Sequence, residues 1–243
     1  MIVGLLHPGE MGAAMGNALR SVGHDVVWAS DGRSDATRSR AEGLRDVGTA
    51  AEVARAAEVV LSICPPHAAL DVARSVGGFF SGTYVDANAI SPARSREVAA
   101  LHGRFVDGGI VGGPPRAAGD TRLYLSGTGA DEIAALFAGS VVDARVVGDA
   151  SALKMVYAAW GKGTAAMLLA VRDVARHYGV WDDLEAEWRE SQPGLDERLA
   201  AAERSAAKKG WRWIGEMEEI ADTFAAAGEP EGFHRAAAEV YRS

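Results

Sequence analysis

The sequence predicts a doubly wound α/β domain with a parallel sheet, followed by a smaller all-helical domain. Three observations predict this fold class. Short apolar runs alternate with helix-like segments over residues 1–150, a glycine-rich turn follows the first run, and beyond Gly148 the helical pattern continues alone. Strands that alternate with helices of this length form βαβ units, whose strands run parallel. We therefore expect domains at 1–148 and 149–243.

The strands of the first domain are predicted from runs of β-branched and aliphatic residues that end at turn formers. They cover 1–6, 24–30, 58–64, 82–88, 103–109 and 144–148. Between them, apolar residues recur with the spacing of an amphipathic helix. These predicted helices cover 11–23, 39–48, 68–78 and 92–103.

The second domain is predicted to contain helices alone. Asp149 or Ser151, either of which is a suitable N-cap, begins a long helix that ends near Gly179. A helix over 181–190 is closed by the Pro193-Gly194 break. Three further helices are expected over 195–213, 214–228 and 233–242.

Composition and charge exclude several classes of function. The net charge of −8 disfavours nucleic acid and anionic membranes as partners, since both require clustered Lys and Arg. One cysteine, Cys64, cannot form an intramolecular disulfide and suits a reducing cytoplasm. No apolar run is long enough for a membrane span, and the scattered histidines indicate no metal site. We expect a cytoplasmic protein.

The motif HPGEMG follows the first strand and has the form of a nucleotide-binding glycine loop, G-x-G-x-x-G, with His7 at the first glycine position. In such a loop the middle glycine, Gly9, leaves room for a pyrophosphate, and the last, Gly12, lets the helix lie close to the strand. The free N–H groups at the helix start bind the phosphates. The strand, loop and helix together favour a dinucleotide site over an ordinary strand–helix turn. The residues predicted to contact the cofactor here are His7, Pro8, Gly9, Glu10 and Met11.

The turn after the second strand selects between NAD and NADP. It reads Ser30-Asp31-Gly32-Arg33-Ser34 and so contains both an acid and a base. An acid at this place holds the ribose hydroxyls of NAD, whereas Arg and hydroxyl groups hold the 2′-phosphate of NADP. We favour NADP(H), bound by Ser30, Arg33 and Ser34, over NAD(H), bound through Asp31. A merely polar turn is the remaining interpretation.

Taken together, these motifs resemble the β-hydroxyacid dehydrogenase superfamily, which includes 6-phosphogluconate dehydrogenases and imine reductases. Four further segments are similar to it: VDANAISP (85–92), FVDGGIVGGPPRAAGDTRLYLSG (105–127), SALKMVYAAWGKG (151–163) and WRWIGEMEEIADTFAAAGEPEGFHRAAAE (211–239). The last resembles an uncharacterised phosphogluconate-dehydrogenase-like C-terminal domain. The resemblance implies a Rossmann domain, a helical domain and hydride transfer between a nicotinamide and a small substrate.

The resemblance also implies roles for individual residues. It places the catalytic general acid/base at Lys154, and Tyr157, on the same helix face, is expected to bind substrate or to donate a proton. It brings the segment at Asn88 to the nicotinamide. Cys64 and Pro65 are also expected to contact the cofactor, although the Cys64 thiol could simply be buried. The residues that it assigns to the substrate are Asn88, Gly112, Gly113 and Tyr157.

The sequence departs from the dehydrogenase pattern in two places. An amide is expected one turn after the lysine, where Ala158 stands, and a base is expected near Glu218 and Glu219. Acids there could favour a cationic iminium substrate, although we interpret the glutamates as a solvated helix face. The leading hypothesis is an NADP(H)-dependent dehydrogenase or reductase. The alternatives are an imine reductase with Tyr157 as donor and a binding protein without turnover. The resemblance implies a homodimer.

Overall fold

The computed structural model describes residues 1–242 and divides into two compact units, Met1–Lys154 and Met155–Ser243. The boundary between these units falls inside one long helix, after Lys154. The domain boundary predicted from the sequence, between 148 and 149, lies at the start of that helix. The roles assigned to the two regions stay predictions. Within the described residues, no helix combines the length and the apolar character that a membrane span requires.

The first unit is built on one eight-stranded sheet with the order β3-β2-β1-β4-β5-β6-β7-β8. Every neighbouring pair is parallel except β6 and β7, which are antiparallel. This arrangement confirms the doubly wound α/β fold. The strands are β1 (Ile2–Leu5), β2 (Asp25–Trp28), β3 (Arg45–Asp46), β4 (Val59–Ser62), β5 (Thr83–Asp86), β6 (Phe105–Gly112), β7 (Thr121–Ser126) and β8 (Val142–Val146).

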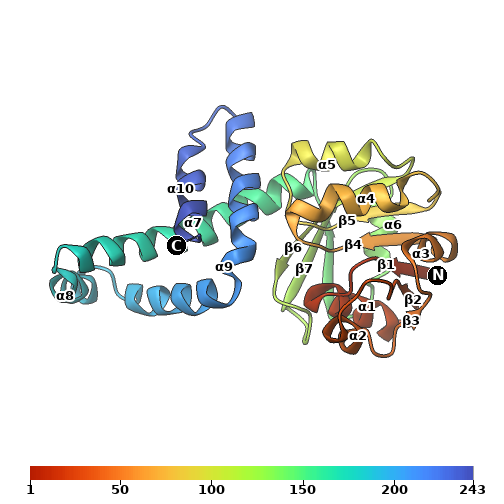
Figure 1. Cartoon of the computed structure of the whole chain (residues 1–243), viewed down its shortest axis with the longest axis horizontal. Helices are drawn as coiled ribbons and strands as arrows, with labels where there is room; N and C mark the ends of the chain where they lie inside the picture. The colour runs from red at the N-terminus through yellow and green to blue at the C-terminus, as the bar shows by residue number, and fades with distance from the viewer. Residues whose placement is uncertain (243) are drawn as a thin grey trace. The chain divides into compact units, whose positions relative to one another are not determined.

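Helices cover both faces of this sheet, and each face has its own apolar core (Figure 1). One core contains Met15 and Leu19 of the first helix; the other contains Val53, Val72 and Val76. Both faces of β1 and β4 are buried, and apart from Ser62 these two strands are apolar, as parallel strands usually are. The helices are α1 (Glu10–Ser21), α2 (Asp35–Arg40), α3 (Ala50–Ala56), η1 (Pro66–Ala68), α4 (Ala69–Gly77), α5 (Pro92–Ala99) and α6 (Ala130–Ala135).

The helix predicted over 39–48 is wrong. The segment finishes α2, turns at Gly43 with a φ of +84° and then forms the short strand β3. Gly43 therefore supplies a left-handed turn that a helix would not tolerate. The short helices α3 and α6 were not predicted, because six or seven residues are too few to establish an apolar period.

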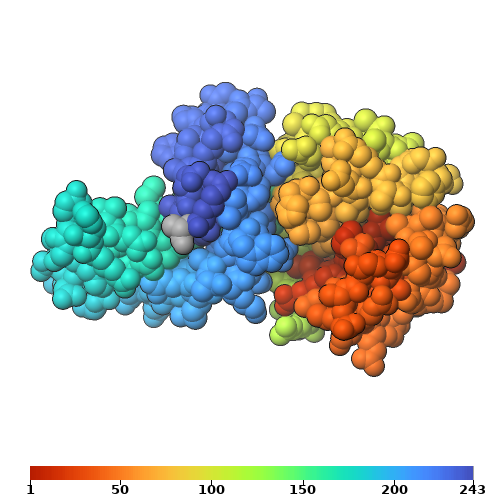
Figure 2. Space-filling model, in the orientation of Figure 1, coloured from red at the N-terminus to blue at the C-terminus, as the bar shows by residue number. Residues whose placement is uncertain are grey.

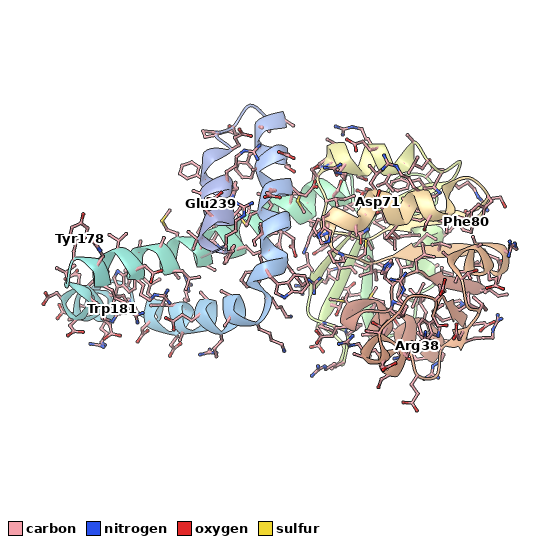
Figure 3. All side chains as sticks on the ribbon, viewed as in Figure 1. Arg38, Asp71, Phe80, Tyr178, Trp181 and Glu239 are labelled. Carbon is pink, nitrogen blue, oxygen red and sulfur yellow. The ribbon has the colours of Figure 1, made fainter. Side chains whose placement is uncertain are left out.

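The second unit consists of helices: α7 (Ala150–His177, from Met155 onward), α8 (Trp181–Ser191), α9 (Leu195–Ala226) and α10 (Gly232–Val240). The two helices predicted over 195–213 and 214–228 form the single helix α9, because no proline interrupts the segment and Gly210 is buried inside it. Tyr178 and Trp181 flank the turn between α7 and α8 (Figure 3). α10 packs against α9, where the rings of Phe224 and His234 lie 4.3 Å apart.

Candidate active site

The carboxyl ends of the parallel strands place several predicted site residues at one edge of the sheet. β1 pairs with β2 on one side and with β4 on the other, so the chain reverses its direction of winding at β1. The loops that follow β1 and β4 therefore leave the sheet on either side of this point. In doubly wound folds, the crevice between such loops is where ligands bind.

The loop after β1 leads directly into α1 and leaves the start of that helix uncapped. Gly9 is the N-cap residue, and as a glycine it provides no side-chain cap to the first turn. The Gly9 N–H donates to the His7 carbonyl at 2.8 Å, and the Gly9 carbonyl accepts the first helical bond, from Ala13 N, at 2.9 Å. The following N–H groups are consequently available to an anion.

The two glycines of the loop have different roles. A Cβ at Gly9 would meet no atom within 4 Å, so the space above the helix start is open. A Cβ at Gly12 would lie 2.5 Å from the carbonyl oxygen of His7, so Gly12 allows α1 to approach the loop. The N-terminal segment, in red, is visible in a recess between the orange segments of the first unit (Figure 2). Gly12 is therefore required by the fold, whereas Gly9 leaves space for a ligand.

His7 and Arg33 lie near each other at this edge, and each has a buried nitrogen without a hydrogen-bond partner among the described residues, Nδ1 and Nε respectively. Burial, together with the nearby Arg33, lowers the pKa of His7 to about 4, so its imidazole is neutral at pH 7. Burial also lowers the pKa of Arg33. Buried polar groups are normally paired, and two unpaired nitrogens in one place fit an anionic ligand.

The turn at residues 30–34, called the ribose turn for the role predicted from its sequence, is held by bonds within the protein. Arg33 N donates to the Ser30 carbonyl at 3.1 Å, and Gly32 adopts a φ of +68°. Although burial opposes it, hydrogen bonds from Ser30 and Gly48 lower the pKa of the Asp46 carboxyl, so the hydroxyl of Ser30 faces Asp46. Ser34 caps α2 through its Oγ. Of the three predicted phosphate ligands, Arg33 has a buried donor, Nε, without a hydrogen-bond partner among the described residues.

Arg38 is a cation at this turn that the sequence analysis did not select. Its Nη2 donates to the Ser30 carbonyl at 2.8 Å, and its side chain extends from α2 (Figure 3). Its position could have indicated it: Arg38 lies four residues after the Ser34 cap, in a helix that begins at this turn.

Asn88 ties the loops after β4 and β5 together. Its Oδ1 accepts from Cys64 N at 2.5 Å, and its Nδ2 donates to Ser62 Oγ at 3.2 Å and to Asp86 Oδ2 at 2.9 Å. Both amide hydrogens are therefore used within the protein. The predicted contact of Asn88 with cofactor or substrate stays a prediction, confined to its carbonyl oxygen. The sequence analysis did not identify Asp86 as its partner.

The polar cluster around Asn88 is buried, and burial governs its ionisation. Burial, and then Asp86, raise the pKa of Cys64 to about 12, so the thiol is not a nucleophile. Burial, with Asp107 on the next strand, raises the pKa of Asp86 to about 7. Pro65, directly after Cys64, is the N-cap of the short helix η1. Cys64 and Pro65 thus lie at the same sheet edge as the glycine loop.

Lys154 lies on α7 against strand β6. A Cβ at Gly109 would come within 2.9 Å of Lys154 Cβ, so the absence of a side chain at Gly109 allows this approach. Gly112 has a φ of +110°, and a Cβ there would meet Asp120 O at 2.0 Å; Gly113 accepts a hydrogen bond from Thr121 Oγ1 at 2.5 Å. Gly112 therefore has a structural reason besides the substrate contact predicted for it, whereas the hydrogen bond at Gly113 involves only its backbone carbonyl.

Tyr157 belongs to the second unit, where its side chain is 56% exposed. The solvated face predicted for GEMEEIA is wrong in part. Glu219 and Glu216 are buried, and Glu216 forms an ion pair with Lys162 of α7. Among the described residues, no group of His, Cys, Asp and Glu is arranged to hold a metal ion.

Two family models match the chain. Residues 2–136 match the NAD binding domain of 6-phosphogluconate dehydrogenase, more than half of the chain, and residues 175–243 match a domain of unknown function (DUF1932). The chain belongs to the 6-phosphogluconate dehydrogenase-like superfamily. This confirms the family predicted from the motifs. The chain is 30% identical to an uncharacterised 28.5 kDa protein of Methanothermus fervidus over 191 residues. These residues cover 76% of this chain and 74% of the relative.

Solved structures show the same superfamily fold. A conserved protein of unknown function, described as similar to 3-hydroxyacid dehydrogenases, is 30% identical with a TM-score of 0.72, over 100% of this chain and 97% of that one. The 3-hydroxyisobutyrate dehydrogenase of Salmonella typhimurium is 16% identical with a TM-score of 0.73 over 100% and 93%. A Streptomyces aurantiacus imine reductase is 20% identical with a TM-score of 0.55 over 100% and 93%. At the last two identities, the likeness concerns the fold alone.

Proposed function

We propose that this protein is an NADP(H)-dependent oxidoreductase that transfers hydride between the nicotinamide and a small carbonyl or hydroxy acid substrate, with Lys154 as general acid/base. One observation carries the proposal. The uncapped start of α1 faces open space at Gly9, and Arg33 has a buried, unpaired nitrogen nearby. A helix N-terminus is suited to a pyrophosphate, and a guanidinium whose Nε has no partner among the described residues is suited to a 2′-phosphate. Membership of the superfamily supports a nicotinamide cofactor.

The protein's own residues have separate tasks in this reaction. The glycine loop holds the pyrophosphate, and Arg33 holds the 2′-phosphate. The bound nicotinamide supplies or accepts the hydride. Lys154 donates a proton to the substrate oxygen during reduction and accepts it during oxidation, which is general acid–base catalysis. The loops at Cys64 and Asn88, tied by their hydrogen bonds, keep this sheet edge rigid.

Imine reduction is the second candidate. The loss of the dehydrogenase amide at Ala158 and the exposed phenol of Tyr157 favour it, because a phenol can protonate an amine nitrogen. In that reaction Tyr157 is the donor and Lys154 is less important. A third possibility, a cofactor-binding protein without turnover, is opposed by the presence of Lys154.

A substrate screen with two variants decides between these functions. Small aldehydes, α-keto acids, 3-hydroxy acids and cyclic imines are tested with NADPH, NADP, NADH and NAD. On the substrate found, Lys154→Ala should lower kcat by about 10²–10⁴, the usual contribution of general acid–base help, without changing NADPH affinity. Tyr157→Phe should act mainly on KM.

The opposite result selects another function. If Tyr157→Phe lowers kcat strongly and Lys154→Ala is mild, the donor is the phenol and the enzyme is an imine reductase. If no compound in the screen causes cofactor consumption while NADPH still binds, the protein is a binding protein.

We also propose that the protein acts as a homodimer in which each partner helps to complete the site. The support is an apolar stripe on α7: Trp160, Met167 and Val174 recur every seven residues and are all exposed. Such a repeat is typical of a helix that packs against another helix.

A further inference from the structure

Asp107 of β6 links four elements of the first unit through its carboxylate. Oδ1 accepts from Ser95 Oγ of α5 at 2.7 Å. Oδ2 accepts from Ser126 Oγ of β7 at 3.2 Å and from the backbone N–H of Ser151, in the first turn of α7, at 2.7 Å. One carboxylate thus fixes the start of α7 to two strands and a helix.

Ser126 extends this link to the N–H group of Ala150, the residue before Ser151 in α7. Its Oγ accepts from Ala150 N at 2.9 Å while it donates to Asp107. The first N–H groups of a helix have no partner within the helix, and they are usually satisfied by a local cap. Asp149 provides such a cap here, by accepting from Ala152 N at 2.7 Å. Ala150 and Ser151 are instead satisfied by side chains of the sheet.

The same face of β6 contacts Lys154. Asp107 and Gly109 are two residues apart on a strand, so their side-chain positions face the same side. At Gly109 a Cβ would lie 2.8 Å from Ala150 O and 2.9 Å from Lys154 Cβ. The helix therefore lies directly on the strand at this point, and Lys154 follows Ser151 by three residues.

We propose that Asp107 is a positioning residue, which, with Ser126, holds the first turn of α7 on β6 and so sets the place of the Lys154 ammonium relative to the cofactor edge. This inference rests on the proposed role of Lys154. Gly109 provides the close approach, and Asp107 fixes where along the strand the helix begins. A small displacement of a catalytic group lowers the reaction rate strongly, because the reacting atoms must be held in a closely defined geometry.

The variants separate positioning from stability. Asp107→Ala removes the acceptor of Ser151 N. Asp107→Asn retains a carbonyl oxygen that can accept from Ser151 and Ser126, while its amide can donate to Ser95. Asp149→Ala is the matched control, because it removes a cap from the same helix turn without touching β6. We expect Asp107→Ala to lower kcat by about 10²-fold. Asp107→Asn should retain most activity, and NADPH affinity should be unchanged in all three.

A readout without turnover keeps this test separate from that of the proposed function. The chain has four lysines, Lys154, Lys162, Lys208 and Lys209. After reductive ¹³C-methylation each gives its own NMR signal, and Lys154→Arg assigns that of Lys154. Asp107→Ala should move the Lys154 signal, whereas Asp107→Asn should not. Asp149→Ala should lower Tm and leave the signal in place.

Three results overturn the proposal: an unmoved Lys154 signal in Asp107→Ala, an equal movement in Asp149→Ala, or an Asp107→Asn variant as impaired as Asp107→Ala. If Asp107→Ala does not fold, Ser126→Ala replaces it with the same expectations, since it removes the acceptor of Ala150 N and one donor to Asp107. If the wild type turns over no substrate, the proposed function fails while the NMR comparison still decides the role of Asp107.

Discussion

His7 occupies the position where dinucleotide loops usually have their first glycine, and the structure shows why the loop tolerates it. The backbone of His7 makes the turn, because its carbonyl accepts from Gly9 N. Its side chain lies beside Arg33 and does not cover the start of α1. The surface proposed to bind the phosphates is therefore formed by backbone groups at Gly9 and beyond, so that we expect the identity of residue 7 to matter less.

Substitution at Gly9 tests this view of the loop. Gly9→Val should fold normally, because its Cβ would meet no protein atom, and should lose NADPH binding, because the side chain fills the phosphate space. His7→Gly should bind NADPH within a few-fold of wild type. Fluorescence titration measures both, and a thermal melt of Gly9→Val checks its fold. Equal NADPH affinity in wild type and a folded Gly9→Val would refute the assignment.

Arg33 tests the choice of cofactor. If its unpaired guanidinium binds the 2′-phosphate, Arg33→Ala should weaken NADPH binding by about 1.5–3 kcal/mol, the value of a hydrogen bond to a charged group. NADH lacks this phosphate and should be little affected. Arg38→Ala is the control, because it removes a different positive charge from the same turn. A wild type that binds NADH more tightly than NADPH would assign the ribose to Asp31 instead.

At the scale of elements, the second unit is held together in part by a buried ion pair. Lys162 of α7 pairs with Glu216 of α9, with 17% and 10% of their side chains exposed. Lys162 also lies 5.7 Å from the ring centre of Trp213, and its carbonyl accepts from Tyr241 Oη at 2.6 Å. The pair thus lies where α7, α9 and the end of α10 meet.

Removing one partner of this pair should lower the free energy of unfolding far more than replacing both partners by apolar residues. Glu216→Ala should cost about 3–5 kcal/mol of unfolding free energy, because it removes a buried carboxylate that pairs with the Lys162 ammonium. The double variant Lys162→Met with Glu216→Leu should come close to wild type, since apolar groups of similar size need no partner. Urea unfolding of the single and double variants measures both. A cost below about 1 kcal/mol for Glu216→Ala would mean that the pair is solvated.

The elements differ in how far the sequence predicts them. The strands β1, β2 and β4 are apolar runs that end at turn formers, so the local sequence pattern is enough to predict them. The β3 region failed because Gly43 and a two-residue strand carry no periodic signal. The links made by Asn88 and Asp107 could not be predicted, since each joins residues far apart in the chain, and the pattern does not show which loops meet.

At the scale of the whole molecule, α7 presents apolar side chains that the chain itself does not cover. Trp160 is 75% exposed, and Met167, Val174 and Tyr178 continue the same face. A monomeric protein rarely leaves such a continuous stripe in water. The seven-residue repeat matches the packing of a second, identical helix, which a closed two-fold dimer would supply.

Breaking the stripe should separate the subunits. The wild type should have twice the 25.4 kDa mass of the chain in sedimentation equilibrium. Trp160→Asp should raise the dimer Kd at least ~30-fold, since a central aromatic at an interface contributes about 2 kcal/mol or more. Phe233→Asp is the control: Phe233 is also apolar and exposed, but it belongs to α10 and not to α7. If wild type sediments as a monomer at high concentration, or if both variants weaken the dimer alike, the α7 stripe is not the dimer interface.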